Sequence, residues 1–121
     1  MAKVLVVDDE EPIRLLATLV LSRAGHDVTC AETGDRALDA ALSLGGVDIV
    51  LLDLHTPGRP WTETLNDLRR QLPEIKCVLS SGNPKDSLET PPEDGSFVHY
   101  LQKPYRADEL TAIISRALKT D

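Results

Sequence analysis

Residues 47–53, VDIVLLD, form a nearly continuous apolar run that ends in an aspartate. A short run without regular polar alternation is typical of a β-strand that is covered on both faces. Residues 3–7, KVLVV, are followed by Asp8 and Asp9 in the same way. Strands of this kind, separated by stretches of helical periodicity, predict a parallel sheet, and ligands of such sheets bind at the carboxyl ends of the strands.

Strands and helices alternate along the rest of the chain. Pro12 suits the first turn of a helix and Gly25 its end, while Gly45-Gly46 ends a second helix. The alternation predicts an α/β fold, a five-stranded parallel sheet with helices on both faces. The expected strands are Lys3–Val7, Val28–Cys30, Val47–Leu52, Ile75–Leu79 and Phe97–Leu101, and the expected helices are 12–24, 33–44, Thr62–Leu72 and Ala107–Leu118. Residues 85–96 contain Pro91-Pro92, so any helix there is short or irregular.

The composition is that of one globular domain covering residues 1–121. The chain is 41% hydrophobic and 27% charged, and its 13 basic and 20 acidic side chains give a net charge of −7. This charge disfavours direct binding of nucleic acid or anionic membranes. No apolar run approaches the roughly 18 residues of a membrane span, and four apolar residues at 4–7 are too few for a secretory signal. A single cytoplasmic domain is expected.

The two cysteines, Cys30 and Cys77, both stand within apolar stretches. This placement favours buried free thiols, with a disulfide or a metal pair as the alternative. Neither cysteine has a Cys/His spacing typical of a zinc site.

Polar residues stand at the predicted carboxyl ends of four strands: Asp8 and Asp9, Asp53, Ser81, and Lys103. Each has an ordinary explanation alone, such as an acid near a helix N-terminus, a turn former, a cap or a solvated lysine. Together they indicate function, because clustered carboxylates repel one another unless a cation lies among them. Mg²⁺ prefers such oxygen ligands, an ammonium group suits a phosphoryl oxygen, and a carboxylate can form an acyl phosphate.

Four segments carry a resemblance to a known family. They are LVVDDE at 5–10, VLLDL at 50–54 followed by Pro57-Gly58, VLSSG at 78–82, and YLQKPY at 100–105. In this order and spacing the whole chain resembles the receiver domain of two-component response regulators. The resemblance implies a flavodoxin-like fold with strand order 2-1-3-4-5.

The resemblance also implies a role for each matching residue. Asp53 would accept a phosphoryl group, and Mg²⁺ would be held by Asp9, by Asp8 directly or through water, by Asp53 and by the backbone carbonyl of His55. Lys103 would pair with the phosphoryl group, next to a proline, Pro104, that often follows a cis bond. Ser81 would bond the phosphoryl group, and Tyr100 would then change rotamer and alter the surface around strands four and five.

The implied partner is a sensor histidine kinase or a histidine phosphotransfer protein. The chain would catalyse only its own phosphorylation and dephosphorylation, and it would be monomeric when unphosphorylated. It is expected to be a stand-alone receiver or one excised from a hybrid histidine kinase.

The segment after Asp53 departs from the family. Thr56-Pro57 replaces the common Met-Pro, and Trp61 stands where a glycine is frequent. Trp61 is expected to be half-exposed near the site, either packing on its helix or contacting a partner. The His55 side chain is expected to lie over the site without a catalytic task, with a ligand or acid/base role as the alternative. His26 and His99 are expected at the surface or at strand edges.

Three other functions compete with the phospho-accepting switch. A small Mg²⁺-dependent phosphatase would commonly have a second acid two residues after its nucleophile, where this chain has His55. A flavin-mononucleotide carrier needs a Ser/Thr/Gly-rich phosphate loop after the first strand, where residues 8–11 are all acidic. A receiver fold used only as a phosphorylation-independent binding module would not need the intact set of Asp8, Asp9, Asp53, Ser81 and Lys103.

Overall fold

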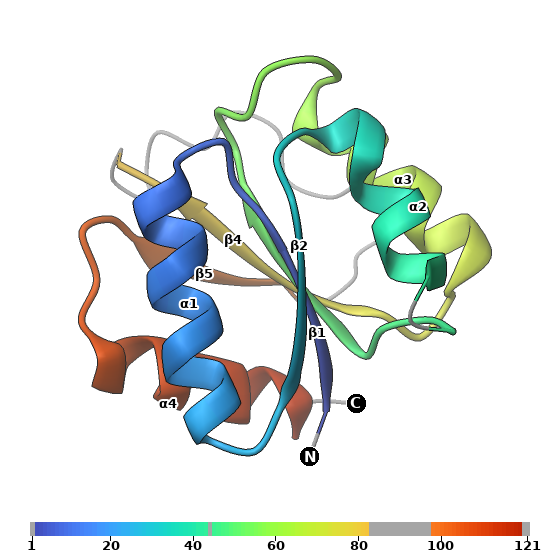
Figure 1. The fold of residues 1–121 in the computed structure, drawn as a ribbon. Coiled ribbons are helices and arrows are strands. Elements are labelled where there is room, and N and C mark those ends of the chain that lie inside the picture. Colours follow the sequence, from blue (N-terminus) through green and yellow to red (C-terminus); the bar gives the residue numbers. More distant parts are fainter. Residues whose placement is uncertain (1, 44, 83–97, 120–121) are drawn as a thin grey trace.

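Five parallel strands form one sheet in the order β2-β1-β3-β4-β5 in the computed structural model, which describes residues 2–43, 45–82 and 98–119 (Figure 1). The predicted parallel sheet and its strand order are therefore confirmed. Parallel strands place all their carboxyl ends at one edge, which is the upper edge in Figure 1. The strands are β1 (Lys3–Val7), β2 (Asp27–Ala31), β3 (Ile49–Asp53), β4 (Lys76–Ser81) and β5 (Val98–Gln102).

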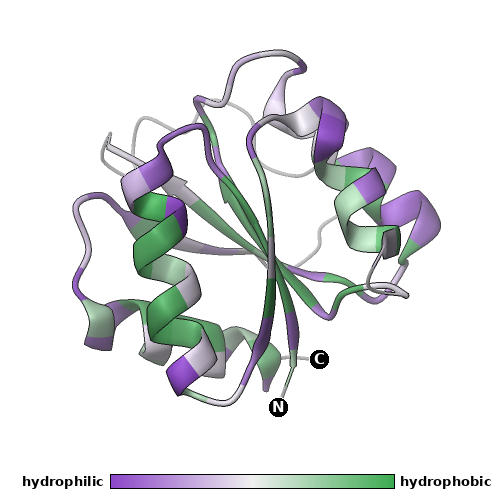
Figure 2. Ribbon diagram, in the orientation of Figure 1, coloured by the Kyte–Doolittle hydropathy of each residue, from purple (hydrophilic) through white to green (hydrophobic). Residues whose placement is uncertain are grey.

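Among the described residues, two helices lie on each face of the sheet. On one face lie α1 (Glu11–Arg23) and α4 (Ala107–Leu118), and on the other lie α2 (Gly34–Ser43) and α3 (Trp61–Gln71) (Figure 1). Apolar residues concentrate on the strands and on the helix faces that point toward them (Figure 2). The core consequently divides into two apolar clusters, one on each side of the sheet.

The central strands explain why the sequence shows unbroken apolar runs. Alternate side chains of β1 and β3 enter the two clusters, so that Val4 and Ile49 face α1 and α4 while Leu5 and Val50 face α2 and α3. All four side chains are fully buried. Because each such side chain contributes about 1.5–3 kcal/mol when it leaves water, both faces of these strands must be apolar.

The strand ends differ from the prediction by one or two residues. Strand β3 begins at Ile49 instead of Val47 and includes Asp53, and β4 extends through Ser81. Asp53 lies opposite Ser80 in the register, and the Leu54 N–H donates to the Ser80 carbonyl at 2.9 Å. Backbone pairing thus continues past the apolar run, where hydropathy gives no signal. The predicted short helix at 85–96 lies outside the described residues.

Both cysteines are free thiols, as predicted, but only Cys77 is fully buried. Cys30 lies on β2, the edge strand, and is partly exposed, with its sulfur 3.3 Å from Thr18 Oγ1. The expectation of a buried Cys30 is wrong because an edge strand has a neighbour on one side only. Within the described ranges, every helix is too short or too polar to cross a bilayer.

Candidate functional site

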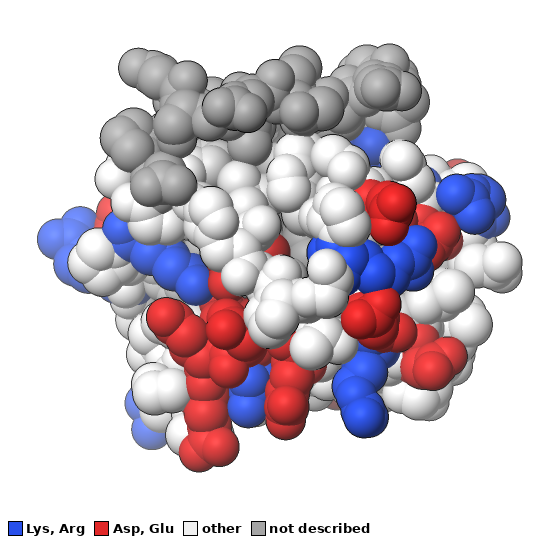
Figure 3. Space-filling model, turned by 90° about the horizontal axis from the view of Figure 1, so that it is seen from above, with Lys and Arg blue, Asp and Glu red and all other residues white. Residues whose placement is uncertain are grey.

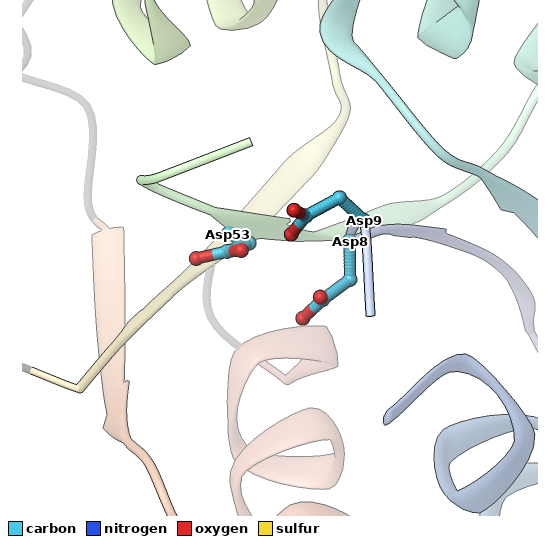
Figure 4. Close-up of side chains that lie close together, drawn as sticks. All are labelled: Asp8, Asp9 and Asp53. Atoms are coloured by element: carbon cyan, nitrogen blue, oxygen red, sulfur yellow. The ribbon is translucent and has the colours of Figure 1, made fainter. Parts of the chain in front are cut away.

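Three carboxylates converge at the carboxyl-end edge of the sheet. Asp8 and Asp9 directly follow β1, Asp53 is the last residue of β3, and their side chains project into the same region (Figure 4). One oxygen from each lies within 4.8 Å of the others. Asp8 and Asp53 are only 3% and 4% exposed, while Asp9 is exposed. The fold thus brings together the three acids that the sequence analysis selected.

An ammonium group lies between two of these acids. Lys103 follows β5, and its Nζ is 2.8 Å from Asp8 Oδ2, 3.4 Å from Asp53 Oδ2 and 3.7 Å from Glu10 Oε2. Its backbone N–H donates to the Ser81 carbonyl at 2.8 Å, which fixes the residue against the end of β4. The bond from Lys103 to Pro104 is cis.

Local hydrogen bonds orient the buried carboxylates. The His55 N–H donates to Asp53 Oδ1 at 3.2 Å, and the Thr56 hydroxyl donates to the Asp53 carbonyl at 3.2 Å. The Glu10 N–H donates to Asp8 Oδ1 at 2.9 Å. These bonds begin immediately after the strands end, so the chain turns away while the carboxylates stay at the edge of the sheet.

The site carries an excess of negative charge that the pKa values reflect. Burial raises the pKa of Asp53 and the nearby charge of Asp8 adds to this, against the lowering effects of the His55 N–H and of Lys103. Burial alone would lower the pKa of Lys103, but its hydrogen bond to Asp8 and the charges of Asp53 and Asp8 outweigh this and raise it. Lys103 therefore stays charged, while ionised Asp53 is held at a cost.

The donor set fits a hard divalent cation. Asp8, Asp9 and Asp53 offer carboxylate oxygens as metal ligands, and the Lys103 ammonium group contacts two of these carboxylates. Mg²⁺ binds through one or two carboxylates together with water and phosphate oxygens, and softer metals prefer nitrogen or sulfur ligands.

Ser81 and His55 meet beside the carboxylates. Ser81, the last residue of β4, is 1% exposed, and its Oγ lies 3.0 Å from His55 Nε2. The sequence analysis did not predict this contact, because no sequence signal relates the loop after β3 to the end of β4. Tyr100 lies half-buried on β5 and packs against the cluster beneath α2 and α3.

Two contributors to the site were not selected from the sequence. Glu10 approaches Lys103 from the exposed side. Tyr105 is buried, its hydroxyl has no hydrogen-bond partner among the described residues, and burial together with the charge of Asp8 raises its pKa to about 12. In the sequence, Tyr105 stands between Lys103-Pro104 and the apolar positions of α4. This context indicates packing and does not predict a place in the site.

The loop between β3 and α3 is tied to both helices on its face of the sheet. Arg59 forms ion pairs with Glu63 at 3.6 Å, with Asp67, and more distantly with Asp35 at 4.0 Å. Trp61, the first residue of α3, is half-buried as expected and packs against the cluster beneath α2 and α3.

The other two histidines are partly buried. His26 accepts a hydrogen bond from the Ala2 N–H through Nδ1, and His99 lies on β5, at the edge of the sheet.

The upper face of the molecule shows how these charges are distributed. Acidic side chains gather over the carboxyl ends of the strands, with basic side chains set among them (Figure 3). The surroundings of the site are thus acidic as well as its centre.

Comparison with known proteins identifies the family. The response regulator receiver domain model matches residues 4–115. The chain belongs to this family. It is 33% identical over 120 residues to the sensor kinase CckA of Brucella abortus, covering 98% of this chain and 13% of that protein. It is 34% identical over 116 residues to the uncharacterized transcriptional regulatory protein YkoG of Bacillus subtilis, covering 96% of this chain and 50% of that one.

A solved structure agrees with this assignment. The receiver chain superimposes on NtrX of Brucella abortus in complex with ATP with a TM-score of 0.81 at 32% identity, covering 98% of this chain and 27% of NtrX. The receiver thus spans half or less of these relatives. Receiver domains are signalling switches of two-component systems rather than classical enzymes, and they generally bind Mg²⁺ through an acidic pocket. Membership of the family supports a phospho-accepting signalling role for this domain.

Proposed function

We propose that Asp53 accepts a phosphoryl group from a phosphohistidine of a sensor histidine kinase or histidine phosphotransfer protein. The observation that carries this proposal is the setting of Asp53, a buried carboxylate held by the His55 N–H and Lys103 beside two further acids. On this proposal residues 1–121 act as one receiver domain that is monomeric when unphosphorylated.

The transfer is a displacement at phosphorus. An Asp53 carboxylate oxygen forms a bond to phosphorus, and the bond from phosphorus to the histidine nitrogen breaks, with its electron pair returning to the imidazole. Lys103, 3.4 Å from Asp53 Oδ2, is placed to neutralise phosphoryl oxygens as they approach. The chain thus supplies position and charge, which are the main requirements of phosphoryl transfer.

The proposed cation site consists of Asp8, Asp9 and Asp53 with the backbone carbonyl of His55. Bound Mg²⁺ would supply charge neutralisation for the phosphoryl oxygens and a template for their orientation. Asp9, the exposed member, is proposed as a direct ligand, and Asp8 as a ligand directly or through water. Lys103 contacts Asp8 at 2.8 Å, so it would share that carboxylate with the cation.

The response is proposed to start at Ser81, whose hydroxyl bonds the phosphoryl group at the end of β4. Tyr100 on the neighbouring strand β5 then changes rotamer, and the surface around β4 and β5 changes with it. The two strands pair directly, with Ser81 opposite Gln102 and Leu79 opposite Tyr100. New contacts in the phosphorylated form would shift the balance between two conformations.

Intact-mass analysis tests the proposal. The wild type and Asp53→Asn are incubated with a small phosphodonor, with and without Mg²⁺. One Mg²⁺-dependent phosphoryl adduct on the wild type, absent from the variant, is the expected result. No adduct under any condition would reassign the domain to phosphorylation-independent binding. Repeated hydrolysis of the donor that depends on Asp53 but leaves no lasting adduct would favour a phosphatase.

A further inference from the structure

His55 connects the proposed phosphoacceptor to the proposed switch hydroxyl. Its backbone N–H donates to Asp53 Oδ1 at 3.2 Å, and its ring Nε2 lies 3.0 Å from Ser81 Oγ. Asp53 lies opposite Ser80 in the register of β3 and β4, so Ser81 is the next position along the neighbouring strand. One residue thus contacts both groups that would surround a phosphoryl group.

The chemistry of a phosphoryl group constrains this contact. Phosphoryl oxygens only accept hydrogen bonds, and a serine hydroxyl carries a single proton. If Ser81 gives its proton to the phosphoryl group, it can keep its bond to His55 only by accepting from the ring. If Ser81 donates to His55 instead, the ring and the phosphoryl group compete for the same proton.

Hydrogen-bond stoichiometry favours the first arrangement. The ring then donates to Ser81, Ser81 donates to the phosphoryl group, and no proton is shared between two acceptors. The nitrogen that reaches Ser81 at the carboxyl-end edge is Nε2.

We propose that His55 is a positioning residue for phosphoryl acceptance: its Nε2–H donates to Ser81 Oγ and thereby directs the Ser81 proton toward the phosphoryl group on Asp53. Hydrogen bonds arranged in such a chain strengthen one another in a site shielded from water. The inference rests on the proposed function.

Beryllium fluoride provides the test, because it forms a tetrahedral anionic adduct on a carboxylate oxygen. Its dissociation constant is measured by calorimetry in saturating Mg²⁺ for the wild type, His55→Phe, His55→Gln, Ser81→Ala and His55→Phe/Ser81→Ala. Phenylalanine keeps an aromatic ring but has no hydrogen-bond donor, whereas glutamine retains an N–H that can reach Ser81.

His55→Phe is expected to weaken binding about 5-fold, equivalent to about 1 kcal/mol at 1.36 kcal/mol per tenfold change. His55→Gln is expected to stay within about twofold of the wild type, and in the Ser81→Ala background His55→Phe is expected to have no effect. His55→Phe would then weaken binding only when the Ser81 hydroxyl is present. A general packing role of the ring would weaken binding in both backgrounds.

Several outcomes would overturn the inference. Tighter binding by His55→Phe would show that the ring competes for the Ser81 proton, and an equal loss with and without the Ser81 hydroxyl would show that the ring acts independently of it. If the variants unfold, the ¹⁵N shifts of the wild-type imidazole decide, since a proton on Nδ1 alone contradicts the proposal. A wild type that binds no beryllium fluoride would instead refute the proposed function itself.

Discussion

Replacing Lys103 by methionine removes the only ammonium group that contacts the buried carboxylates within the described part of the chain, and it keeps an unbranched side chain of similar length. Lys103 is 14% exposed, with its Nζ 2.8 Å from Asp8 and 3.4 Å from Asp53. At an effective dielectric constant of about 20, these distances correspond to attractions of about 6 and about 5 kcal/mol. Dehydration of the charges offsets much of this attraction.

Breaking one partner out of a buried ion pair typically costs about 3–5 kcal/mol, because a charge remains without compensation. Since this site opens to solvent on the Asp9 side, the lower end applies, and Lys103→Met is expected to lose about 3 kcal/mol of unfolding free energy near neutral pH without metal. The folded pKa of Lys103 is raised above 10.5. The contribution of the lysine is therefore complete below pH 10.5 and is lost as the pH rises through the folded pKa.

Urea unfolding followed by circular dichroism measures this difference. Lys119→Met, at the exposed end of α4, is the matched control and is expected to change stability by less than about 0.5 kcal/mol. Saturating Mg²⁺ is expected to restore more stability to Lys103→Met than to the wild type, because the cation replaces the lost positive charge. Equal stability of wild type and Lys103→Met near neutral pH, or a difference that persists unchanged at strongly alkaline pH, would refute the electrostatic account.

Three further predictions follow from the site and the core. Burial and the charge of Asp8 raise the pKa of Asp53 above 3.8, so ionised Asp53 opposes folding above that pH. Asp53→Asn is therefore expected to raise the metal-free melting temperature by roughly 2–4 °C near neutral pH, with no gain below pH 3.8. Mg²⁺ is expected to change Trp61 fluorescence in the wild type but not in Asp9→Asn, and an unchanged wild-type signal would contradict coupling of this loop to the cation site. Burial raises the pKa of Cys77 from 9.0 to about 12, which lowers its thiolate fraction about 1000-fold. A disulfide reagent is therefore expected to label Cys30 in the folded protein and Cys77 only after unfolding.

The sequence was sufficient to predict the sheet because its two central strands are buried on both sides. The runs at 3–7 and 49–52 have no regular polar positions, and the structure buries nearly all of them. The same reasoning failed at strand ends. Asp53 and Ser81 pair within the sheet although they are polar, since backbone hydrogen bonds do not depend on side-chain hydropathy.

The candidate site could be predicted as a set of residues but not as a set of contacts. Parallel topology alone brings Asp8, Asp53 and Lys103 to one edge. The contact between His55 and Ser81 depends instead on how the loop after Asp53 turns, and that turn involves the Thr56 hydroxyl and the His55 N–H. Local side-chain to backbone bonds of this kind vary with single residues and leave no periodic signal.

The charges at the edge of the sheet explain why the domain would bind a cation before it accepts a phosphoryl group. The cluster of Asp8, Asp9 and Asp53 has one ammonium group in contact with it, that of Lys103, so about two negative charges remain uncompensated before any phosphate arrives. An incoming phosphoryl donor adds further negative charge, and like charges at such distances repel by several kcal/mol where water is partly excluded. A divalent cation cancels the excess, whereas Lys103 alone cannot. Phosphorylation is therefore expected to depend on cation charge as well as on Asp53. Replacing Asp9 by a neutral residue is not expected to substitute for Mg²⁺, because the replacement removes a metal ligand together with the negative charge.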